Sequence, residues 1–549
     1  MPAVTPQASQ KPDVSVILTT FNGAAHVECA LDSLVRQTIG LERMQVLIVD
    51  DGSTDATPAI LERYAAENPG FEVIRQSNWG GPAQPRNRAL ANVRGRYLFI
   101  LDHDDSVADD ALEAMVRVAD ENGTDVVVAR MKGFGGRNTP RVMFSRTVPR
   151  TDVFSCSAYW LLNPMKLFRM SMVRALELKF DTEVPWGEDQ SFVASAYIKG
   201  NGISILADKD YVNWVYRADG SNITTSVVSL AARMPVVDRM LDFVAANVPP
   251  GTDRDRLMRR HFLVEVLTSA FEGYRTEQDH ALRNAAFERF HELADAYYTE
   301  RIDADFPPNG RVLMRLVLEG RSDEFGEYLD ALKQAGRPDV LLEDAHVFLK
   351  LPWFREPDKG LPDGLFDIAG SLRVECRTEP LVVDGSGVRL SAWCRLGLLT
   401  DRVTAVDLVA RSRARSAERS FQLGHAVVLD EQRPYVMVED SIASGHLLSR
   451  LPAGKYELFL RVAAGPTMRE RRVRECAPPP AEVRGIRSRS HFGLARVATL
   501  VTTGPGNLSL NVVDEVTGLR RRLRRIRRLA GGIVRRLAGQ TGDRSRAPV

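Results

Sequence analysis

Residues 96–105 read RYLFILDHDD, an apolar run that ends in three aspartates. The run from Tyr97 to Leu101 has the length and composition of a strand that is buried on both faces of a sheet. Asp102, Asp104 and Asp105 follow it almost directly. Ligands of open α/β sheets bind beyond the carboxyl ends of the strands, so this stretch predicts both a fold class and the position of a site.

Apolar runs of the same kind alternate with helical patterns on either side of this stretch. Such alternation predicts a mostly parallel, doubly wound α/β sheet. The predicted strands are residues 14–20, 44–50, 71–76, 96–102 and 124–130. The predicted helices are residues 24–38, 57–68, 87–93 and 110–122.

The length of 549 residues and the 44% hydrophobic content predict a globular chain of more than one domain. Helical periodicity follows the α/β region, and short strands between Gly, Pro and Asp turns come after it. We predict a disordered stub over 1–12, an α/β domain over 13–225, a helical region over 226–355, a β-sandwich over 366–478 and a tail over 479–549.

The cysteines and the apolar segments bear on the compartment of the protein. Five cysteines lie far apart without a CxxC pair, which fits neither a disulfide framework nor a zinc site. The sequence contains neither a signal-peptide pattern nor an uncharged apolar run of about 20 residues. These features predict a cytoplasmic protein without a membrane span.

The tail is strongly basic. Residues 518–549 contain eleven Arg and one Asp, a net charge of +10 in a chain whose total is +2, so the remaining residues carry −8. Residues 518–538 place apolar side chains on one seam of a basic helix. Three interpretations stay open: peripheral contact with an anionic membrane, a coiled-coil contact between copies, or a solvated tail broken at Gly531.

Three carboxylates at one strand end repel one another unless a cation or hydrogen-bond donors compensate. A divalent ion is the simplest compensation, and oxygen ligands favour Mg²⁺ or Mn²⁺. Asp102 and Asp104 therefore predict a site for a metal-bound diphosphate, in which positive charge stabilises the leaving group. The alternative is an ordinary acidic turn.

Two more acidic pairs stand at element ends. Asp50 and Asp51 follow the second predicted strand, where they suit the N–H of uracil and the hydroxyls of ribose, or cap the next helix. Glu188 and Asp189 begin the helical stretch EDQSFVASAYIKG. One carboxylate there can remove a proton from an accepting hydroxyl, or can stabilise the helix N-terminus.

Five motifs in this order resemble the family-2 glycosyltransferases with the GT-A fold. They are VSVILTTFN (14–22), VLIVDDGSTD (46–55), NRAL (87–90), YLFILDHDD (97–105) and GEDQSF (187–192). Further segments resemble the members of that family that add β-N-acetylglucosamine to the poly(ribitol phosphate) of wall teichoic acid. These segments are 77–90, 129–144, 161–173 and 203–217.

The resemblance implies a GT-A (Rossmann-like) domain that transfers sugar from a UDP-sugar with inversion and with Mn²⁺ or Mg²⁺. It implies Asp104 as the metal ligand and Asp189 as the catalytic base. It also implies immunoglobulin-like modules near the C-terminus that form trimers. The donor-binding residues that it implies are Thr19, Phe21, Asp51, Asn78, Arg86, Asp102, Glu188, Arg217 and Ser221.

Thr19 and Ser221 depart from the pattern of the family, which has proline and histidine there. The departure at Ser221 makes closure of its loop an open point. The acceptor implied is an anionic polyol phosphate, with another surface polysaccharide as the alternative, and UDP-glucose and UDP-galactose remain alternative donors. The basic residues that could bind this acceptor, or form a solvated face, are Arg130, Lys132, Arg137, Arg141, Lys166 and Arg169.

Two other classes of protein compete with this interpretation. A sugar-nucleotide pyrophosphorylase has a Gly-rich, basic phosphate loop after its first strand, and TTFNGAA (19–25) is not such a loop. A carbohydrate-binding protein without catalysis would have no need of the intact acidic motifs. Nothing in the composition indicates a nucleic-acid partner.

Overall fold

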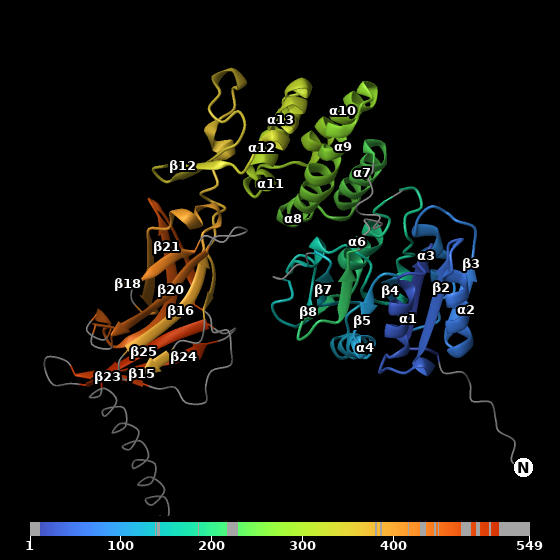
Figure 1. Ribbon diagram of the computed structural model, residues 1–549, viewed down its shortest axis with the longest axis horizontal. Coiled ribbons are helices and arrows are strands. Elements are labelled where there is room, and N and C mark those ends of the chain that lie inside the picture. The colour runs from blue at the N-terminus through green and yellow to red at the C-terminus, as the bar shows by residue number, and fades with distance from the viewer. Residues whose placement is uncertain are drawn as a thin grey trace, which may run out of the picture. The chain divides into compact units, whose positions relative to one another are not determined.

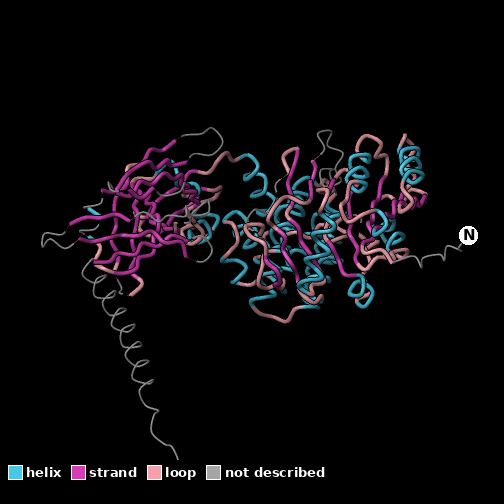
Figure 2. The backbone as a smooth tube through the Cα atoms, turned by 90° about the horizontal axis from the view of Figure 1, so that it is seen from below, coloured by secondary structure: helices cyan, strands magenta, loops and turns pink. Residues whose placement is uncertain are grey.

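The structure is a computed structural model of the chain, and it divides into two compact units. Residues 1–334 form the first unit and residues 335–549 the second. The first unit contains both helices and strands, whereas strands dominate the second (Figure 2). The described residues are 11–137, 139, 143–184, 186–216, 229–378, 382–384, 387–414, 417–428, 435–443, 446–447, 450–473, 485–489, 495–503 and 507–514.

A mixed eight-stranded sheet forms the centre of the first unit, with the order β3-β2-β1-β4-β9-β6-β10-β8 (Figure 1). β1 to β4 pair in parallel, which confirms the predicted core of the sheet. Every residue of β1 and β2 is buried, and this explains their nearly continuous apolar sequences. The strands are β1 (Val14–Thr20), β2 (Met44–Asp50), β3 (Phe71–Arg75), β4 (Tyr97–Asp102), β6 (Val126–Ala129), β8 (Val148–Thr151), β9 (Leu167–Arg169) and β10 (Ile203–Leu206).

The sheet departs from the predicted pattern at β9 and β8. β9 runs antiparallel between β4 and β6, and β8 pairs antiparallel with β10 at the edge. With three residues, β9 is too short to show a periodic pattern in the sequence. A second, three-stranded sheet has the order β5-β11-β7. Its strands are β5 (Ser106–Val107), β7 (Met131–Phe134) and β11 (Val212–Val215).

The four predicted helices of this domain are present with shifted ends. The largest shift is in α3, which begins four residues before the predicted start at Asn87. α4 ends at Gly123, whose positive φ of 61° suits a residue without a side chain. The helices are α1 (Val27–Val35), α2 (Thr57–Glu67), α3 (Ala83–Leu90), α4 (Ala111–Asn122), α5 (Met170–Ala175) and α6 (Gln190–Lys199).

Helices fill the rest of the first unit, as predicted for this region. A cluster of aromatic rings forms their core, in which the ring of Phe325 meets the rings of Phe271 and Tyr274 edge to face at 4.8 and 5.0 Å. The elements are α7 (Leu230–Asn247), α8 (Thr252–His261), a π-helical segment η4 (Phe262–Ala270), α9 (Phe271–Thr276), α10 (His280–Tyr297), α11 (Glu300–Ala304), α12 (Pro308–Leu318) and α13 (Ser322–Gln334).

The helices end earlier than the predicted boundary at residue 355. The hairpin β12 (Asp339–Glu343) and β13 (His346–Lys350) lies within the range predicted as helical. Gly336 and Pro338 separate this hairpin from α13. Both residue types disfavour helix, so the difference has a local cause.

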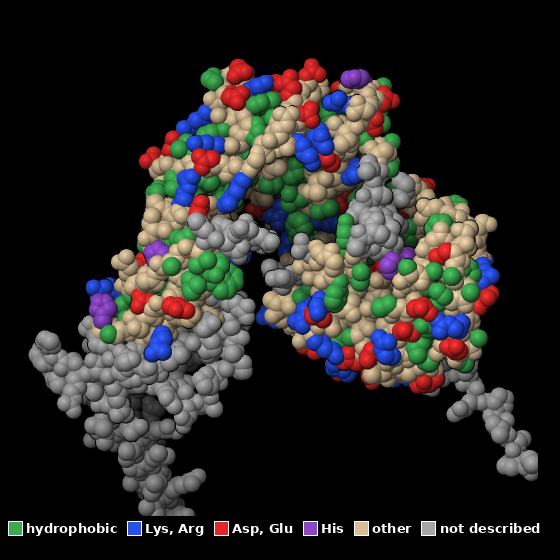
Figure 3. Space-filling model, viewed as in Figure 1, with side chains coloured by type: hydrophobic (Ala, Val, Ile, Leu, Met, Phe, Trp, Pro, Cys, Tyr) green, Lys and Arg blue, Asp and Glu red, His purple; other side chains and the backbone are tan. Residues whose placement is uncertain are grey.

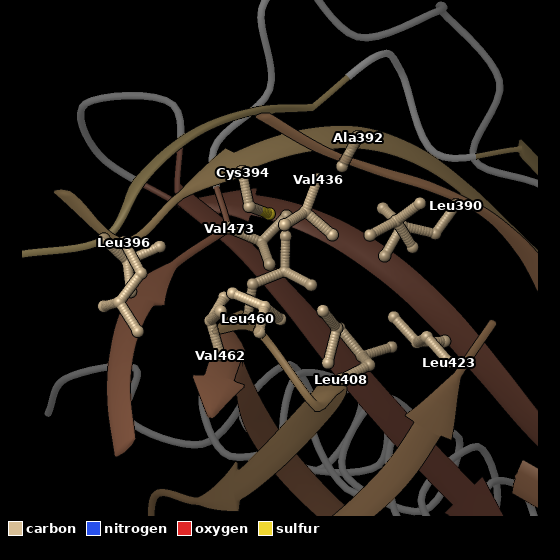
Figure 4. Packing of buried hydrophobic residues seen from close by; sticks show 14 of the residues in the cluster. Leu390, Ala392, Cys394, Leu396, Leu408, Leu423, Val436, Leu460, Val462 and Val473 are labelled. Carbon is tan, nitrogen blue, oxygen red and sulfur yellow. The ribbon is translucent and has the colours of Figure 1, made fainter. Parts of the chain in front are cut away.

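Besides the β12–β13 hairpin, the described part of the second unit contains two larger antiparallel sheets, with the strand orders β14-β16-β20-β19 and β18-β17-β21-β25-β24-β23. Side chains from both sheets meet in one core, where Leu390 and Val436 of the first lie near Leu408 and Leu460 of the second (Figure 4). The strands are β14 (Glu375–Thr378), β15 (Val382–Asp384), β16 (Gly387–Arg395), β17 (Ala405–Ser412), β18 (Glu418–Leu423), β19 (His425–Val428), β20 (Tyr435–Ala443), β21 (Gly454–Ala464), β22 (Thr467–Arg472), β23 (Gly485–Arg489), β24 (Ala495–Thr503) and β25 (Asn507–Asp514).

The β structure continues past the predicted boundary at residue 478. β23, β24 and β25 lie in the range predicted as tail, and β25 pairs with β21 of the same sheet. The predicted basic helix over 518–538 lies outside the described residues, so its three interpretations stay predictions. Among the described helices, none has the length and apolarity needed to cross a membrane.

The shared core of the second unit predicts the effect of a cavity there. Leu460 is fully buried in β21, so Leu460→Ala should lower the free energy of unfolding by about 2–5 kcal/mol, since it removes buried methyl groups and leaves a void. Met468 in β22 is 57% exposed, and Met468→Ala should change that free energy by less than about 0.5 kcal/mol. Urea unfolding followed by circular dichroism measures both. Equal effects of the two substitutions would contradict the shared core.

Candidate active site

The ends of β1, β2 and β4 meet at one edge of the sheet. The register places Thr19 of β1 opposite Asp102 of β4, and Thr20 of β1 opposite Asp50 of β2. Asp51 continues this edge, since its N–H donates to the carbonyl of Thr20 at 2.9 Å. The predicted nucleotide residues Thr19 and Asp51 therefore lie on the same edge as the aspartates that follow β4.

The turn after β2 is folded tightly against the loop after β3. One oxygen of Asp51, Oδ1, accepts hydrogen bonds from Gln76 Nε2 at 2.6 Å and from the backbone N–H of Trp79 at 3.1 Å. Gly52 has a φ of 79°, and a Cβ atom on it would lie 2.7 Å from the backbone nitrogen of Asn78. Only glycine permits this approach, which places Asn78 beside the turn that carries Asp51.

A second contact ties the loop after β1 to the same turn. Asn22 donates its backbone N–H to Ser53 Oγ at 2.9 Å, and its Oδ1 accepts from the backbone N–H of Thr54 at 2.8 Å. Phe21 precedes this anchor and is 45% exposed, so its ring offers an open apolar face at the edge. Aromatic faces of this kind can stack on a flat heterocycle.

Arg86 of α3 joins the two acidic motifs. Its guanidinium is buried and donates from Nη1 to Glu188 Oε1 and from Nη2 to Asp102 Oδ1, each at 2.6 Å. Burial opposes its charge, but the carboxylates of Asp102, Glu188 and Asp189 raise its pKa overall. The prediction had placed Arg86 in the nucleotide pocket. In the structure both of its terminal nitrogens donate to carboxylates of the site, those of Glu188 and Asp102.

Asp105 is separated from the two aspartates before it. Its side chain is 2% exposed, and its Oδ1 accepts from the backbone N–H of Val215 in β11 at 2.7 Å. Burial, together with the charges of Asp102 and Asp104, raises the pKa of Asp105 to about 9. Asp102 and Asp104 are partly exposed, so these two carboxylates face the edge and the third fastens the turn to its support.

The carboxylates at this edge fit a hard divalent cation that is bound together with a diphosphate. Asp102 and Asp104 supply oxygen donors, which Mg²⁺ and Mn²⁺ prefer. Within the described parts of the chain, no three His, Cys, Asp or Glu side chains form a metal-binding group by themselves. The remaining metal ligands would therefore come from the diphosphate and from water, as is usual for Mg²⁺.

Glu188 and Asp189 lie in a turn directly before α6. The N–H of Gln190 donates to the carbonyl of Gly187 at 3.1 Å, which closes the turn. The carboxylate of Asp189 makes no capping bond to α6, so the capping interpretation does not account for it. Burial and the charge of Glu188 raise the pKa of Asp189 to about 7, against the opposing effect of Arg86. A carboxyl group with a pKa of about 7 suits a general base that works at neutral pH.

The predicted acceptor residues fall into two groups. Lys166 is fully buried, and its ammonium group donates to Asn163 Oδ1 at 2.6 Å, so burial excludes it from direct contact with an acceptor in this structure. Arg169 pairs with Asp125 at 3.1 Å and donates to two backbone carbonyls of the domain. Both side chains hold the protein together.

The second group lies nearer the surface. Arg130 pairs with Asp210 at 2.7 Å, the guanidinium of Arg137 lies 4.2 Å from the ring centre of Trp214, and Lys132 is exposed. On the face of the first unit that Figure 3 shows, acidic and basic side chains are mixed, and no single-sign patch stands out among the described residues. Arg141, Arg217 and Ser221 lie outside the described residues.

Residues 15–180 match the Glycosyl transferase family 2 model. The chain contains a family-2 glycosyltransferase domain. Residues 232–328, which contain most of the helices after it, match the Glycosyl transferase TarS linker domain. The first match confirms the predicted resemblance to the family-2 glycosyltransferases, and the second falls within the region predicted as helical.

Two relatives are named for their activity on poly(ribitol phosphate). A poly(ribitol-phosphate) beta-glucosyltransferase of Bacillus spizizenii is 35% identical over 254 residues, which cover 45% of this chain and 40% of the relative. The poly(ribitol-phosphate) beta-N-acetylglucosaminyltransferase TarS of Staphylococcus aureus is 33% identical over 215 residues, which cover 39% of this chain and 37% of TarS. The match thus spans about two fifths of the length of each relative.

Solved structures extend the likeness. The crystal structure of S. aureus TarS matches 91% of this chain and 85% of its own, with a TM-score of 0.60 and 22% identity, which shows a shared fold. A structure of TarS 1-349 in complex with UDP-GlcNAc matches 62% of this chain and 97% of its own, with a TM-score of 0.53 and 25% identity. The glycosyltransferase domain and the TarS linker domain lie together in the first unit of this chain.

A further set of residues beside this site was not predicted from the sequence. Gln190, next to Asp189, contacts Arg260 of the TarS linker domain, and Glu265 pairs with that arginine. The signal was present in RRHFLVEVL (259–267), where charged side chains stand within an apolar helical run. When charged residues in such a run are buried, they are usually paired.

The double ion pair of Arg86 predicts an effect on stability. Arg86→Met leaves Asp102 and Glu188 without their shared cation, so the free energy of unfolding of the first unit should fall by about 2–4 kcal/mol. Arg88 on the same helix is exposed, and Arg88→Met should change it by less than about 0.5 kcal/mol. Thermal unfolding of the two variants measures this difference. A wild-type midpoint for Arg86→Met would show that the pairs do not stabilise the site.

Proposed function

We propose that this chain transfers N-acetylglucosamine from UDP-GlcNAc to a hydroxyl of an anionic polyol-phosphate polymer, with inversion at the anomeric carbon and with Mn²⁺ or Mg²⁺. The observation that carries the proposal is the convergence, through Arg86, of the aspartates after β4 and the Glu188-Asp189 turn. The relatives named for poly(ribitol-phosphate) glycosyltransfer support the substrate class.

In the proposed mechanism the edge of β1 and β2 binds the UDP. Asp51 accepts from donors of the nucleoside, and Phe21 and Asn78 flank it. Asp104, with Asp102 beside it, would hold the divalent ion, which supplies positive charge to the departing diphosphate. Asp102 is also kept in place by Arg86, so its position does not depend on the ligand.

Asp189 is proposed as the general base. Its carboxylate removes the proton from the acceptor hydroxyl as that oxygen attacks the anomeric carbon. The bond between the anomeric carbon and the diphosphate oxygen breaks on the opposite face, and UDP leaves with the bonding electrons. The transition state spreads positive charge over the sugar, as in other glycosyl transfers. Glu188 is held by Arg86 and lies next to the base, where it can contact the sugar.

A second donor follows from a specific observation. The Bacillus spizizenii relative is named a glucosyltransferase, whereas TarS is named an N-acetylglucosaminyltransferase, and the two are nearly equally similar to this chain. UDP-glucose is therefore the second candidate. Assembly through the β sheets of the second unit, membrane contact through residues 518–538 and a cytoplasmic location also remain proposals.

The direct test is release of UDP by the full chain. We expect Mn²⁺-dependent release from UDP-GlcNAc in the presence of poly(ribitol phosphate), with β-linked sugar on the polymer, and loss of release when EDTA removes the metal. UDP-glucose and UDP-galactose are assayed in parallel. Transfer from UDP-glucose alone would correct the donor, and release of pyrophosphate from UTP and a sugar phosphate would overturn the reaction class.

The base assignment predicts both a rate and a pH dependence. Asp189→Asn should lower kcat by at least about 10²-fold with donor affinity retained, because the amide cannot take the proton. Since the pKa of Asp189 is raised to about 7, the carboxyl is protonated below that pH. For the wild type, kcat/KM should therefore rise with pH to about 7 and level off above it. Glu177→Gln, at an exposed position of the same domain, should match the wild type. Wild-type turnover by Asp189→Asn would exclude the assignment.

A further inference from the structure

The turn that carries Glu188 and Asp189 is held from outside the glycosyltransferase domain. Arg239 of α7 pairs with Asp181 at 3.2 Å, and the backbone N–H of Asp181 donates to the carbonyl of Glu188 at 3.1 Å. Gly187 has a φ of 74°, and a Cβ atom on it would lie 3.2 Å from a methyl carbon of Val236 in α7. The TarS linker domain therefore packs directly against this turn.

A network of buried polar side chains reaches the turn from α8 and the π-helical segment. Glu265 is 1% exposed, and its carboxylate accepts from Arg260 Nη1 at 2.7 and 2.8 Å. The same nitrogen of Arg260 donates to Gln190 Oε1 at 3.0 Å. On the other side, His261 lies 2.9 Å from Glu265 Oε2 and 2.9 Å from the hydroxyl of Tyr159. All five side chains are less than one tenth exposed.

The charges within this network of buried side chains balance one another without the carboxylates of the active site. Burial opposes ionisation of Glu265, but Arg260 and His261 hold its pKa below the usual range. Burial lowers the pKa of His261, so its ring is neutral, with its Nδ1–H donating to Glu265 and its Nε2 accepting from Tyr159. Arg260 and Glu265 thus form a closed ion pair. The contact with Gln190 is a neutral extension of that pair.

Asp189 has no capping bond of its own to fix its place, since its side chain makes no bond to the N-terminus of α6. The charges of Glu188 and Asp102 oppose its ionised form, whereas those of Arg86 and Lys166 favour it. Gln190 is the next residue and the first of α6, so fixing its side chain restricts the backbone that carries Asp189.

We propose that Arg260, acting through Gln190, is a positioning residue that sets the place of Asp189, and that the TarS linker domain is thereby part of the catalytic apparatus. This inference rests on the proposed function, in which Asp189 is the base. A shift of about 1 Å in a reacting group can lower a rate by about 10²-fold without loss of substrate binding. A linker that only joined two domains would have no such effect.

The test compares single substitutions in the full chain. Gln190→Met removes the oxygen that Arg260 contacts and leaves the Arg260–Glu265 pair intact, which avoids stranding a buried charge. Arg256→Met is the matched control: Arg256 lies one turn earlier on α8 and donates to the backbone carbonyls of Phe154 and Cys156, away from the turn. Steady-state UDP release gives kcat and the donor KM, calorimetry gives UDP-GlcNAc affinity, and a thermal melt reports folding.

The expected result for Gln190→Met is a fall in kcat of at least about 10-fold with donor KM and affinity within about threefold of the wild type. Arg256→Met should keep kcat within about threefold of the wild type, although it lowers the melting temperature about as much as Gln190→Met does. Wild-type kcat in Gln190→Met would overturn the inference, and so would an equal loss of kcat in Arg256→Met. Wild-type protein that releases no UDP from any donor would instead refute the proposed function.

Discussion

The guanidinium of Arg86 lies between Asp102 and Glu188, which stand 16 and 102 residues away from it along the chain. Three neighbouring carboxylates, Asp102, Glu188 and Asp189, would otherwise repel one another at the edge of a buried sheet. The single buried cation of Arg86 lets them share that edge. In the proposed reaction Asp104 would hold the metal-bound diphosphate and Asp189 would act on the acceptor hydroxyl. The geometry of the proposed reaction depends on this interaction.

Each half of the site is then fixed by a different part of the fold. The edge that carries Thr19, Asp51 and Asp102 depends on the parallel strands, because the register of β1, β2 and β4 brings these residues together. Asp105 fastens the aspartate turn to β11. The Glu188-Asp189 turn is supported by helices outside the glycosyltransferase domain, through Arg239, Val236 and Arg260. Residues of both domains of the first unit therefore support the Glu188-Asp189 turn: Arg86 precedes it in the sequence, and the linker-domain residues follow it.

The sequence predicted the strands that carry the site, because β1, β2 and β4 are buried on both faces and so are almost continuously apolar. It also predicted that Asp102, Asp104 and Asp189 belong to the site. It could not predict the partners of Arg86, since an ion pair over 102 residues leaves no periodic trace. Lys166 was expected at the surface because its charge is visible in the sequence. Its burial was not predicted, because burial arises from tertiary packing. The short strand β9 and the late strands β23 to β25 were missed because local pattern does not identify a strand by its neighbours.

The central claim is that the aspartates after β4 and the Glu188-Asp189 turn form one donor site around Arg86. A crystal structure of the full chain with UDP-GlcNAc and Mn²⁺ tests it most directly. The account predicts the metal on Asp104 at the diphosphate, the uracil beside Asp51, and the anomeric carbon between Asp104 and Asp189, with both ion pairs of Arg86 retained. A donor bound away from the ends of β1, β2 and β4, or a complex in which Arg86 has left both carboxylates, would contradict it.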